Sequence, residues 1–331
     1  MRIIVDAMGG DNGPKEVVKG SIQAIKDFDI TVVLVGNDKI LKEELDRNNY
    51  HGDRIEIVHA DEVITNDDSP TMAIRRKKNS SMVIGLNCLN NGDGDAFISA
   101  GNTGSLLSGG IFLIKRIKEI ERAAIATVYP TKMGMSLLLD AGANVDCKPQ
   151  FLKQFAIMGS IYVEKVFGIE TPKVGLINVG TEPEKGNILV KETYNLLESS
   201  NINFVGNIEA RELPSGVVDV IVCDGFVGNV VLKLTEGLGQ TIFSMLKEEF
   251  TSNTLSKMGA LILKPQLKSF KDRFDYRQYG GAPLLGIKKP VIKAHGSSDA
   301  LAFKNAIRQG ILFVEKQVIN KIEEDIVNIK I

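Results

Sequence analysis

Short apolar runs rich in β-branched residues recur along the chain. Each ends in glycine and small polar residues, and a segment with helical spacing follows. RIIVDA from Arg2 predicts a first strand, and Pro14 suits the first turn of a helix. Apolar residues then recur at helical spacing from Val17 to Phe28, and TVVLVG from Thr31 predicts the next strand. This stretch therefore predicts a βαβ unit.

The same order returns four more times, in segments that each combine a strand-like run with a helical pattern. The runs are DAFISA from Asp95, KVGLINVG from Lys173, VDVIVCDGF from Val218 and VIKAHGSSDA from Val291. Such alternation predicts an α/β fold with three layers, in which helices cover both faces of a large, mostly parallel sheet. No low-complexity linker divides residues 1–331, so we expect a single domain of two interlocked lobes. The nearly all-helical segment at about residues 238–271 predicts a protruding helical hairpin.

The charge balance and the cysteines narrow the classes of protein. The chain has 331 residues, with 40 Lys and Arg against 41 Asp and Glu, which argues against nucleic-acid binding. Cys88, Cys147 and Cys223 are widely spaced, which indicates buried thiols in a reducing compartment and no disulfide or zinc framework. No apolar stretch approaches the ~20 residues of a spanning helix. We expect a cytoplasmic protein that at most lies on a membrane surface, and we expect no metal.

Five predicted strands end in loops rich in glycine and small polar residues. Glycine lets the backbone approach an anion, and helix N-termini beyond parallel strands favour negative charge. Such turns are common in α/β proteins, but five together favour a phosphate site. The candidate residues for binding phosphate or substrate are Asp6, Met8, Gly9, Gly10, Ser99, Gly101, Asn102, Thr103, Gly104, Gly186, Asn187, Asp224, Gly225, Gly296, Ser298 and Asp299.

Familiar catalytic motifs are missing. The chain has no GxxxxGK[ST], no GxGxxG after a strand, no GxSxG and no HExxH. Of the three histidines, His295 alone follows a predicted strand in a plausible loop. It is either a structural residue near a helix N-terminus or a donor to a phosphate or a developing oxyanion. Lys185 is likewise either solvated or a point charge facing a phosphate.

Long motifs in order along the chain resemble one family. They are DAMGGDNGP at Asp6, AIRRKKNSSM at Ala73, SAGNTG at Ser99, DAGANVDCKPQFLKQFAIMG at Asp140, GLINVGTEPEKGN at Gly175, VCDGFVGNVVLK at Val222, RFDYRQYGGAPLLG at Arg273 and IKAHGSSDA at Ile292. The chain resembles the acyl-acyl-carrier-protein:phosphate acyltransferases, the PlsX family of bacterial phospholipid synthesis. Many members have His where this chain has Asn12, which argues against an obligatory acid–base role there.

The resemblance implies a reaction and its partners. Inorganic phosphate attacks the thioester of a long-chain acyl-acyl carrier protein, and the acyl phosphate then feeds a membrane acyltransferase that acylates glycerol 3-phosphate. The family is similar in fold to isocitrate and isopropylmalate dehydrogenases and to phosphate acetyltransferase. It implies a homodimer without a cofactor. Phosphate is itself a nucleophile, so positioning and oxyanion stabilisation are the main tasks.

Within this resemblance, specific residues take roles. We expect Asn102, Thr103, Gly104 and Lys185 to hold phosphate, with His295 and Ser297 beside the reacting carbonyl. Asn229, within VCDGFVGNVVLK, completes the catalytic candidates. Asp6, Asp224 and Asp299 are expected to orient donors, since carboxylates repel phosphate.

Two surfaces suggest partners. The basic run Arg75, Arg76, Lys77 and Lys78 is either a solvated helix face or the landing surface for the acidic carrier protein. The lysines of the hairpin are an alternative dock. Near the hairpin tip an apolar face is either a dimer or core helix, or an amphipathic tip that enters a membrane surface. Its residues are Leu255, Met258, Leu261 and Ile262.

Three other functions stay open on the residues alone. A phosphate acetyltransferase-like enzyme would use short acyl-CoA on a related fold. A membrane-associated scaffold for lipid enzymes would have no catalysis, but the polar loops argue against it. A dehydrogenase is disfavoured because the chain lacks a dinucleotide fingerprint.

Overall fold

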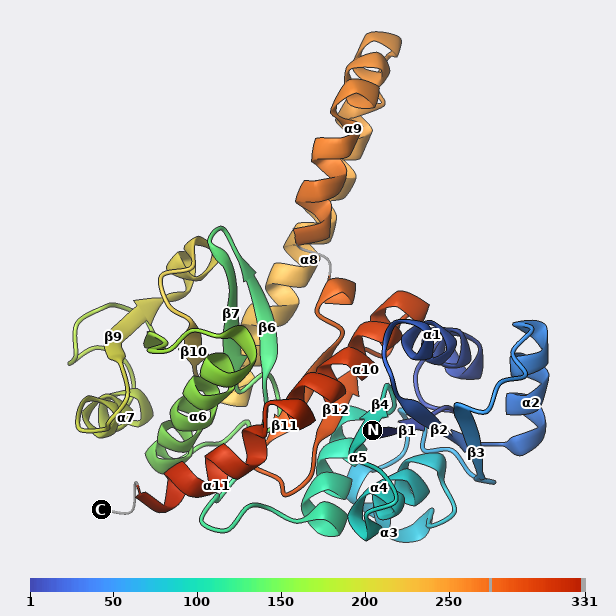
Figure 1. The fold of residues 1–331 in the computed structure, drawn as a ribbon. Helices are drawn as coiled ribbons and strands as arrows, with labels where there is room; N and C mark the ends of the chain where they lie inside the picture. The colour runs from blue at the N-terminus through green and yellow to red at the C-terminus, as the bar shows by residue number, and fades with distance from the viewer. Residues whose placement is uncertain (274–275, 329–331) are drawn as a thin grey trace.

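The structure, a computed structural model, describes residues 1–273 and 276–328 as two α/β lobes with a helical hairpin standing out from them (Figure 1). The first lobe holds a seven-stranded sheet in the order β3-β2-β1-β4-β12-β11-β5. The run from β3 to β12 is parallel, whereas β11 pairs antiparallel with β12 and β5. The strands are β1 (Arg2–Asp6), β2 (Thr31–Gly36), β3 (Ile55–His59), β4 (Ala96–Ser99), β5 (Ala124–Ile125), β11 (Gly281–Leu285) and β12 (Val291–Ala294).

The second lobe holds a five-stranded sheet in the order β6-β7-β10-β8-β9. All its neighbours are parallel except β6, which forms an antiparallel hairpin with β7. The strands are β6 (Thr127–Thr131), β7 (Gly134–Leu139), β8 (Val174–Asn178), β9 (Phe204–Glu209) and β10 (Val220–Val222). The expected mostly parallel arrangement is therefore confirmed, and it is divided between two sheets.

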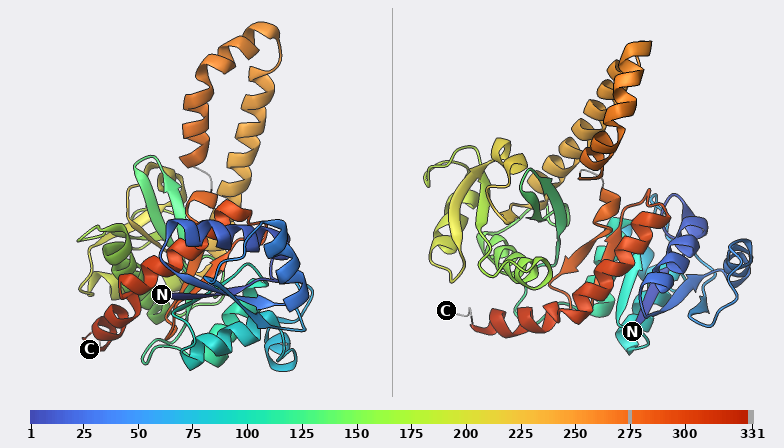
Figure 2. Two further views of the ribbon diagram at one scale, coloured as in Figure 1. Left: turned by 45° about the vertical axis from the view of Figure 1, so that its right-hand side comes forward. Right: turned by 45° about the horizontal axis from the view of Figure 1, so that its top comes forward.

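Helices cover the sheets on both faces (Figures 1 and 2). In the first lobe they are α1 (Gly13–Asp27), α2 (Asp38–Arg47), α3 (Pro70–Arg76), α4 (Ser81–Asn91), α5 (Thr103–Gly109) and α10 (Ala300–Glu315). In the second lobe they are α6 (Pro149–Tyr162), α7 (Ile188–Glu198) and α11 (Val318–Asn328). Helices α10 and α11 are consecutive, and α11 packs on α6, so the chain crosses from the first lobe to the second at its end.

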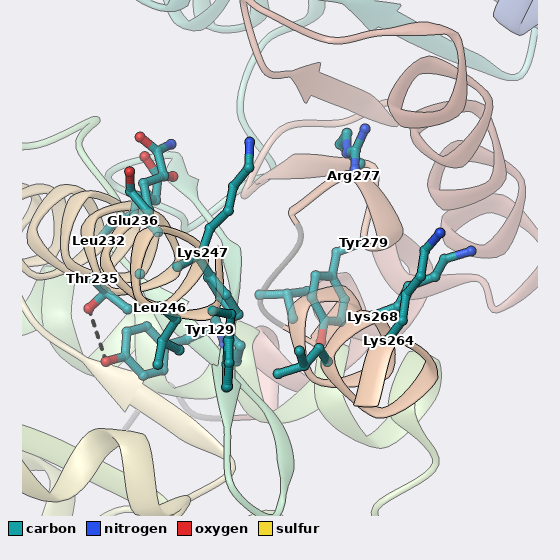
Figure 3. Close-up of a pocket in the computed structure, with 18 of the residues that line it drawn as sticks. Tyr129, Leu232, Thr235, Glu236, Leu246, Lys247, Lys264, Lys268, Arg277 and Tyr279 are labelled. Carbon is teal, nitrogen blue, oxygen red and sulfur yellow. Dashed lines mark hydrogen bonds between the residues drawn. The ribbon is translucent and has the colours of Figure 1, made fainter. Parts of the chain in front are cut away.

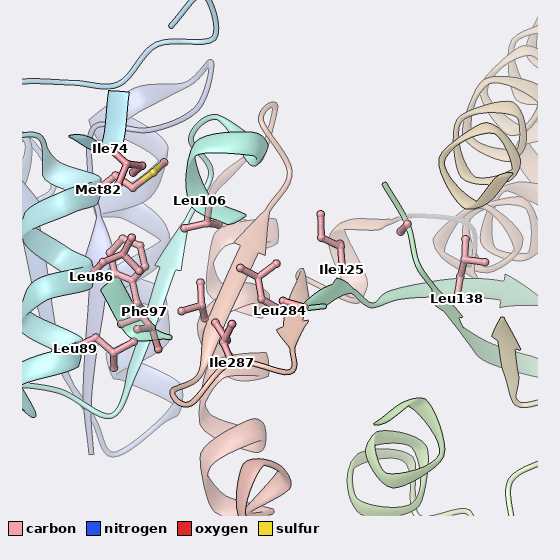
Figure 4. Packing of buried hydrophobic residues seen from close by; sticks show 14 of the residues in the cluster. Ile74, Met82, Leu86, Leu89, Phe97, Leu106, Ile125, Leu138, Leu284 and Ile287 are labelled. Carbon is pink, nitrogen blue, oxygen red and sulfur yellow. The ribbon is translucent and has the colours of Figure 1, made fainter. Parts of the chain in front are cut away.

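Alternate residues of β1 show why the first lobe has three layers. Ile3 and Val5 belong to one buried cluster with Phe303 of α10, whereas Ile4 belongs to another with Leu86 of α4. Side chains of a strand point to opposite faces in turn, so a fully buried strand needs a helical layer on each side. The second cluster continues from α4 through Leu284 to Leu138 of the second lobe (Figure 4). An apolar core therefore connects the lobes.

The hairpin is longer than the sequence pattern indicated. It consists of α8 (Gly225–Phe250) and α9 (Thr254–Arg273), which pack against each other. Helix α8 starts directly after β10, so its first turns belong to the second lobe and its later turns project (Figure 2). Among the described residues, no helix combines the length and the apolar character needed to span a bilayer.

Candidate active site

Asp6, at the end of β1, anchors the loops of the first lobe. Its carboxylate is buried and accepts the hydroxyls of Ser81 and Ser99, each at 2.7 Å, and the backbone N–H of Met8 at 3.2 Å. Ser99 in turn accepts the N–H of Gly101 at 3.0 Å. Burial raises the pKa of Asp6, and these hydrogen bonds oppose the rise. Asp6 thus orients the loops after β1 and β4 from inside the protein.

Glycines let three loops touch backbone to backbone. A Cβ on Gly9 would lie 2.7 Å from the Asp6 carboxylate and from the Gly101 nitrogen. Gly10 has φ +90°, and a Cβ there would lie 2.9 Å from the Gly296 oxygen. The N–H of Asp11 donates to that same oxygen at 2.8 Å. Because β1, β4 and β12 are neighbours in the sheet, the loops that follow them meet at one edge.

Asn12 ties the first of these loops to the loop after β12. Its Nδ2 donates to the carbonyl oxygens of Ser297 and Ser298, both at 3.1 Å. The Asn12 amide therefore acts as a hydrogen-bond donor to the backbone of the loop after β12. Ser298 is buried beside it.

His295 and Ser297 form a close pair in the loop after β12. The backbone N–H of Ser297 donates to His295 Nδ1 at 3.3 Å, and the Ser297 Oγ lies 2.8 Å from the same nitrogen. Since Nδ1 accepts a backbone donor, the ring proton of the neutral imidazole is on Nε2. Burial lowers the pKa of His295; the charges of Lys233 and Lys293 lower it further, whereas Glu236 and Asp11 raise it. At neutral pH the ring is therefore an uncharged N–H donor.

Lys293 lies two residues before His295 on β12, and sequence reasoning missed it. Its Nζ donates to the carbonyl oxygen of Ala100 at 3.3 Å and also to that of Ala294. Burial lowers the pKa of Lys293 to about 8, with the charge of Lys233 acting in the same direction and those of Asp6 and Asp11 opposing it. A lone lysine within the apolar strand VIKA is the signal that would have found it.

In the loop after β4, the Asn102 side chain caps helix α5. Asn102 accepts the N–H of Ser105 at 2.9 Å, and its Nδ2 reaches the carbonyl oxygen of Asn66 at 3.3 Å. Thr103 is exposed, and a Cβ on Gly104 would lie 2.7 Å from the Pro70 side chain. The side chain of Asn102 thus shapes the loop rather than extending into solvent.

A second cluster gathers the candidates Asp224, Gly225 and Asn229 in the second lobe. Asp224 caps α8 by accepting the N–H of Val227 at 2.8 Å, and the N–H of Gly225 donates to the Asn144 oxygen at 2.7 Å. Asp140, at the end of β7, holds the facing loop by accepting the N–H groups of Ala143 and Asn144. Asn229 is exposed on α8 with its Cβ close to Gly142.

Lys185 belongs to a third polar loop, in the second lobe. Its loop follows β8, where its carbonyl oxygen accepts Asn178 Nδ2 at 3.0 Å and Asn187 caps α7. Gly186 has φ +90° and packs on the Asn178 side chain. The Lys185 side chain is exposed, and within the described residues it makes no hydrogen bond to the His295 loop or to the Asp224 loop. Its assignment to the phosphate site stays a prediction.

Charged side chains at the base of α8 interact electrostatically with groups of the first lobe. Lys233 and Glu236 form a 2.8 Å ion pair there. The charge of Lys233 lowers the pKa of His295, and that of Glu236 raises it. Lys233 also acts on Lys293. Asn229, Lys233 and Glu236 follow one another at helical spacing, so they share one face of α8. Charged groups on α8 thus influence the ionisation of His295 and Lys293 in the other lobe. The sequence patterns did not reveal Lys233.

Asp299 and two members of the basic run, Arg75 and Lys77, make contacts within the first lobe. Asp299 caps α10 through the N–H of Ala302 and pairs with Arg277 at 3.0 Å. In the basic run at the end of α3, Arg75 lies over the Phe112 ring and Lys77 pairs with Asp68 at 2.6 Å. Arg76 and Lys78 are exposed.

Burial or partial burial keeps the three cysteine thiols protonated at neutral pH. Burial raises the pKa of Cys147 to about 12, helped by the charges of Asp140 and Asp224, and burial also raises those of Cys88 and Cys223. In residues 1–273 and 276–328, no three His, Cys, Asp or Glu side chains are arranged to hold a metal ion.

Polar loops at the carboxyl edges of parallel strands, with cations and a neutral imidazole between two α/β lobes, define the site of an enzyme acting on an anionic ligand. The fold is shared with EutD phosphotransacetylase from Staphylococcus aureus, with TM-score 0.62, 16% identity, and coverage of 96% of this chain and 94% of that one. A 4-hydroxythreonine-4-phosphate dehydrogenase from Klebsiella pneumoniae gives TM-score 0.53 at 13% identity, covering 94% and 98% of the two chains.

Sequence comparison goes further than the fold. Residues 1–321 match the family described as fatty acid synthesis protein. A phosphate acyltransferase of Alkaliphilus oremlandii is 56% identical over 326 residues, 98% of this chain and 97% of that protein. One from Clostridium botulinum is 50% identical over 330 residues, 99% and 98% of the two chains. The chain belongs to this family and is an acyltransferase, which confirms the resemblance carried by the sequence motifs.

Proposed function

We propose that this enzyme transfers a long-chain fatty acyl group from the thioester of an acyl-acyl carrier protein to inorganic phosphate. A phosphate oxygen attacks the thioester carbonyl, the carbon–oxygen bond forms, and the carbon–sulfur bond of the tetrahedral intermediate breaks. The carrier thiolate leaves with the electron pair and takes up a proton. The acyl phosphate is then a donor for a membrane acyltransferase that acylates glycerol 3-phosphate.

The observation that carries the proposal is a neutral His295 whose pKa is lowered by burial and by the charges of two lysines. The charges of Lys293 and Lys233 both lower the pKa of the imidazole. Two cations that influence the same ring suit a site for a dianionic nucleophile. The neutral tautomer presents Nε2–H as a donor to the developing oxyanion. Phosphate is already nucleophilic and a thiolate leaves readily, so these groups need only position the reactants and stabilise charge.

The first test is thiol release from palmitoyl-acyl carrier protein, with and without inorganic phosphate. We expect release only with phosphate, and hydroxylamine should trap the acyl phosphate. Release without phosphate would indicate a thioesterase. No release from this thioester or from acyl-CoA would shift the function to binding or scaffolding.

A second candidate function is transfer of a short acyl group from coenzyme A, favoured by the fold shared with a phosphotransacetylase. Acetyl and palmitoyl thioesters of both carriers separate the two functions. A higher kcat/KM for acetyl-CoA than for palmitoyl-acyl carrier protein would select the short-chain enzyme.

Acyl carrier proteins are acidic, so we expect the carrier protein to bind to a basic surface of this enzyme. Because Arg76 and Lys78 are exposed at the end of α3, the double variant Arg76→Glu/Lys78→Glu should raise KM for the acyl carrier protein. The control Lys26→Glu/Lys39→Glu makes the same charge change at exposed positions elsewhere and should not. If only Lys257→Glu/Lys264→Glu raises KM, the dock is on the hairpin.

The hairpin tip is proposed to contact the membrane surface. Leu255, Met258, Leu261 and Ile262 are 80%, 60%, 69% and 78% exposed, an apolar patch flanked by lysines. Such a surface binds anionic lipid by inserting its apolar face among the headgroups. Leu255→Glu should reduce sedimentation with phosphatidylglycerol vesicles, whereas Val205→Glu, on exposed β9, should not. Equal sedimentation of both variants would contradict the contact.

A homodimer is proposed to cover the outer face of α8. Leu234, Leu238, Ile242 and Met245 form an exposed apolar stripe at helical spacing, on the side opposite to Leu232, Gly239 and Phe243. A helix that is apolar on both sides must be covered on both. Light scattering should give a dimer for the wild type and a monomer for Leu234→Glu/Leu238→Glu. A monomeric wild type would contradict this proposal.

A further inference from the structure

A cavity lies between β6 and the two helices of the hairpin. Its volume is about 850 Å³, within the range of pockets that enclose a small molecule. Leu232, Phe243 and Phe250 of α8 line it, together with Leu267 of α9 and Tyr129 of β6. Tyr129 closes the floor through a 3.1 Å hydrogen bond between its hydroxyl and that of Thr235 (Figure 3). The cavity is thus a mainly apolar space inside the hairpin.

The cavity is elongated along α8. Its lining runs from Leu232 to Phe250, which at the helical rise corresponds to about 27 Å. A two-carbon acyl group would leave nearly all of this length empty, whereas a long hydrocarbon chain would follow it. The shape therefore favours an extended apolar ligand.

One end of the cavity adjoins the candidate active site. Glu236 lines the cavity, and its charge acts on His295. Arg277 also lines it and pairs with Asp299, four residues after His295, at 3.0 Å. Asn305 of α10 fixes this arginine by donating to its carbonyl oxygen at 2.7 Å. A ligand whose chain lies in the cavity would therefore have its head near His295.

Basic side chains also contribute to the lining. The stems of Lys247, Lys264 and Lys268 line the cavity along the hairpin, and Arg277 lines it at the base (Figure 3). Long basic side chains cover apolar surface with their stems while keeping the ammonium in water. These lysines therefore leave the interior of the cavity apolar.

We infer that this cavity holds the fatty acyl chain of the substrate, with the thioester or acyl phosphate at the Glu236 and Arg277 end. The inference rests on the proposed acyl transfer, and it adds the site that determines selectivity for acyl-chain length. Each methylene that enters an apolar site strengthens binding about fourfold. The preference for long chains should thus come from the hairpin.

Gly239 offers a direct test. It lines the cavity, and a Cβ built on it meets no atom within 4 Å, so Gly239→Phe fills open space without displacing the helix. Gly237 is the matched control: it lies on the same helix, is equally open, and does not line the cavity. Replacing glycine inside a helix also improves its propensity, so both variants should fold.

The readout is the ratio of kcat/KM for palmitoyl to that for octanoyl thioester, which cancels any loss of active enzyme. We expect Gly239→Phe to lower this ratio at least about fifteenfold, the loss of two methylenes or more, and Gly237→Phe to leave it unchanged. An unchanged ratio in Gly239→Phe, or an equal fall in both variants, would overturn the inference.

Binding of hexadecyl phosphate, which has no reactive carbonyl, separates this inference from the proposed reaction. Calorimetry should show it binding the wild type and Gly237→Phe more tightly than Gly239→Phe. If the wild type transfers no acyl group yet shows this pattern, the acyl-transfer proposal fails and the chain site stands. If it transfers acyl groups without this pattern, the chain site alone fails.

Discussion

The backbone N–H of Ser297 donates to Nδ1 of His295 at 3.3 Å, so the main chain itself selects the tautomer of the imidazole. A side-chain partner is not needed for this selection, although the Ser297 hydroxyl lies 2.8 Å from the same nitrogen. Because burial and two lysines lower the pKa of His295, the ring stays neutral and keeps its proton on Nε2 at neutral pH.

Replacing His295 should therefore act on catalysis more than on binding. We expect His295→Gln to lower kcat by about 10²–10³, the loss typical of one oxyanion donor, with a smaller change in KM for phosphate. Ser297→Ala keeps the backbone donor and should lose less. Steady-state thiol release measures both effects, and His59→Gln, at an exposed histidine bound to Asp61, is the control. An unchanged kcat in His295→Gln would remove the ring from the reaction.

Lys293 should set an alkaline limit on phosphate binding. Its pKa of about 8 means that the ammonium is lost as the pH rises through about 8. We expect kcat/KM for phosphate to fall above that pH, and Lys293→Met to give a lower value without this decline. A pH profile with phosphate as the varied substrate measures it; the same alkaline limb in both proteins would contradict the assignment.

For the stability of the fold, the lowered pKa of Lys293 predicts the opposite dependence on pH. Since the folded pKa of Lys293 is lowered from 10.5, the unfolded chain binds more protons between about pH 8 and 10.5, and stability contributed by this site rises with pH in that window. At pH 7 the charged, buried amine is a cost. Lys293→Met should therefore unfold at a higher urea concentration than the wild type at pH 7, with the difference shrinking by pH 10. A less stable variant at pH 7 would show that the ammonium is well compensated.

The sequence revealed the loops of the first lobe because one rule locates them. Gly9, Gly101 and His295 follow predicted parallel strands, and the carboxyl ends of such strands share an edge. Lys293 was missed because it belongs to a strand, where alternation predicts a buried apolar residue. Lys233 was missed because its electrostatic effect on His295 depends on how the base of α8 is placed relative to the first lobe, and no local pattern encodes that.

Two parts of the fold also escaped the sequence patterns. The β6–β7 hairpin contains Pro130, which lowers strand propensity but is tolerated because β6 is an edge strand. The division into two sheets depends on long-range pairing of β10 with β7 and β8, distant in sequence. By contrast, the helical hairpin was predictable because its periodicity is local, although helix α8 itself begins at Gly225, before the part that projects.

The three cysteine thiols should be unreactive in the folded enzyme. Cys147 has a pKa raised to about 12, and burial raises those of Cys88 and Cys223, so almost no thiolate exists at pH 7.5. Iodoacetamide should leave activity unchanged in the native enzyme, and mass spectrometry should show alkylation of all three cysteines only after unfolding. Rapid native alkylation with loss of activity would indicate an exposed, functional thiolate.

Gly9 should be a position where even a methyl group is costly. The added Cβ would lie 2.7 Å from both the buried Asp6 carboxylate and the Gly101 nitrogen, neither of which can move without disturbing the hydrogen bonds to Ser81 and Ser99. We expect Gly9→Ala to cost about 1–3 kcal/mol of unfolding free energy, as overpacking does, and to raise KM for phosphate. Gly237→Ala, in open space on α8, should instead gain up to about 1 kcal/mol. Urea unfolding of the two variants checks the pair. A Gly9→Ala enzyme as stable as the wild type would mean that the three loops can separate, and that their close contact is not what shapes the site.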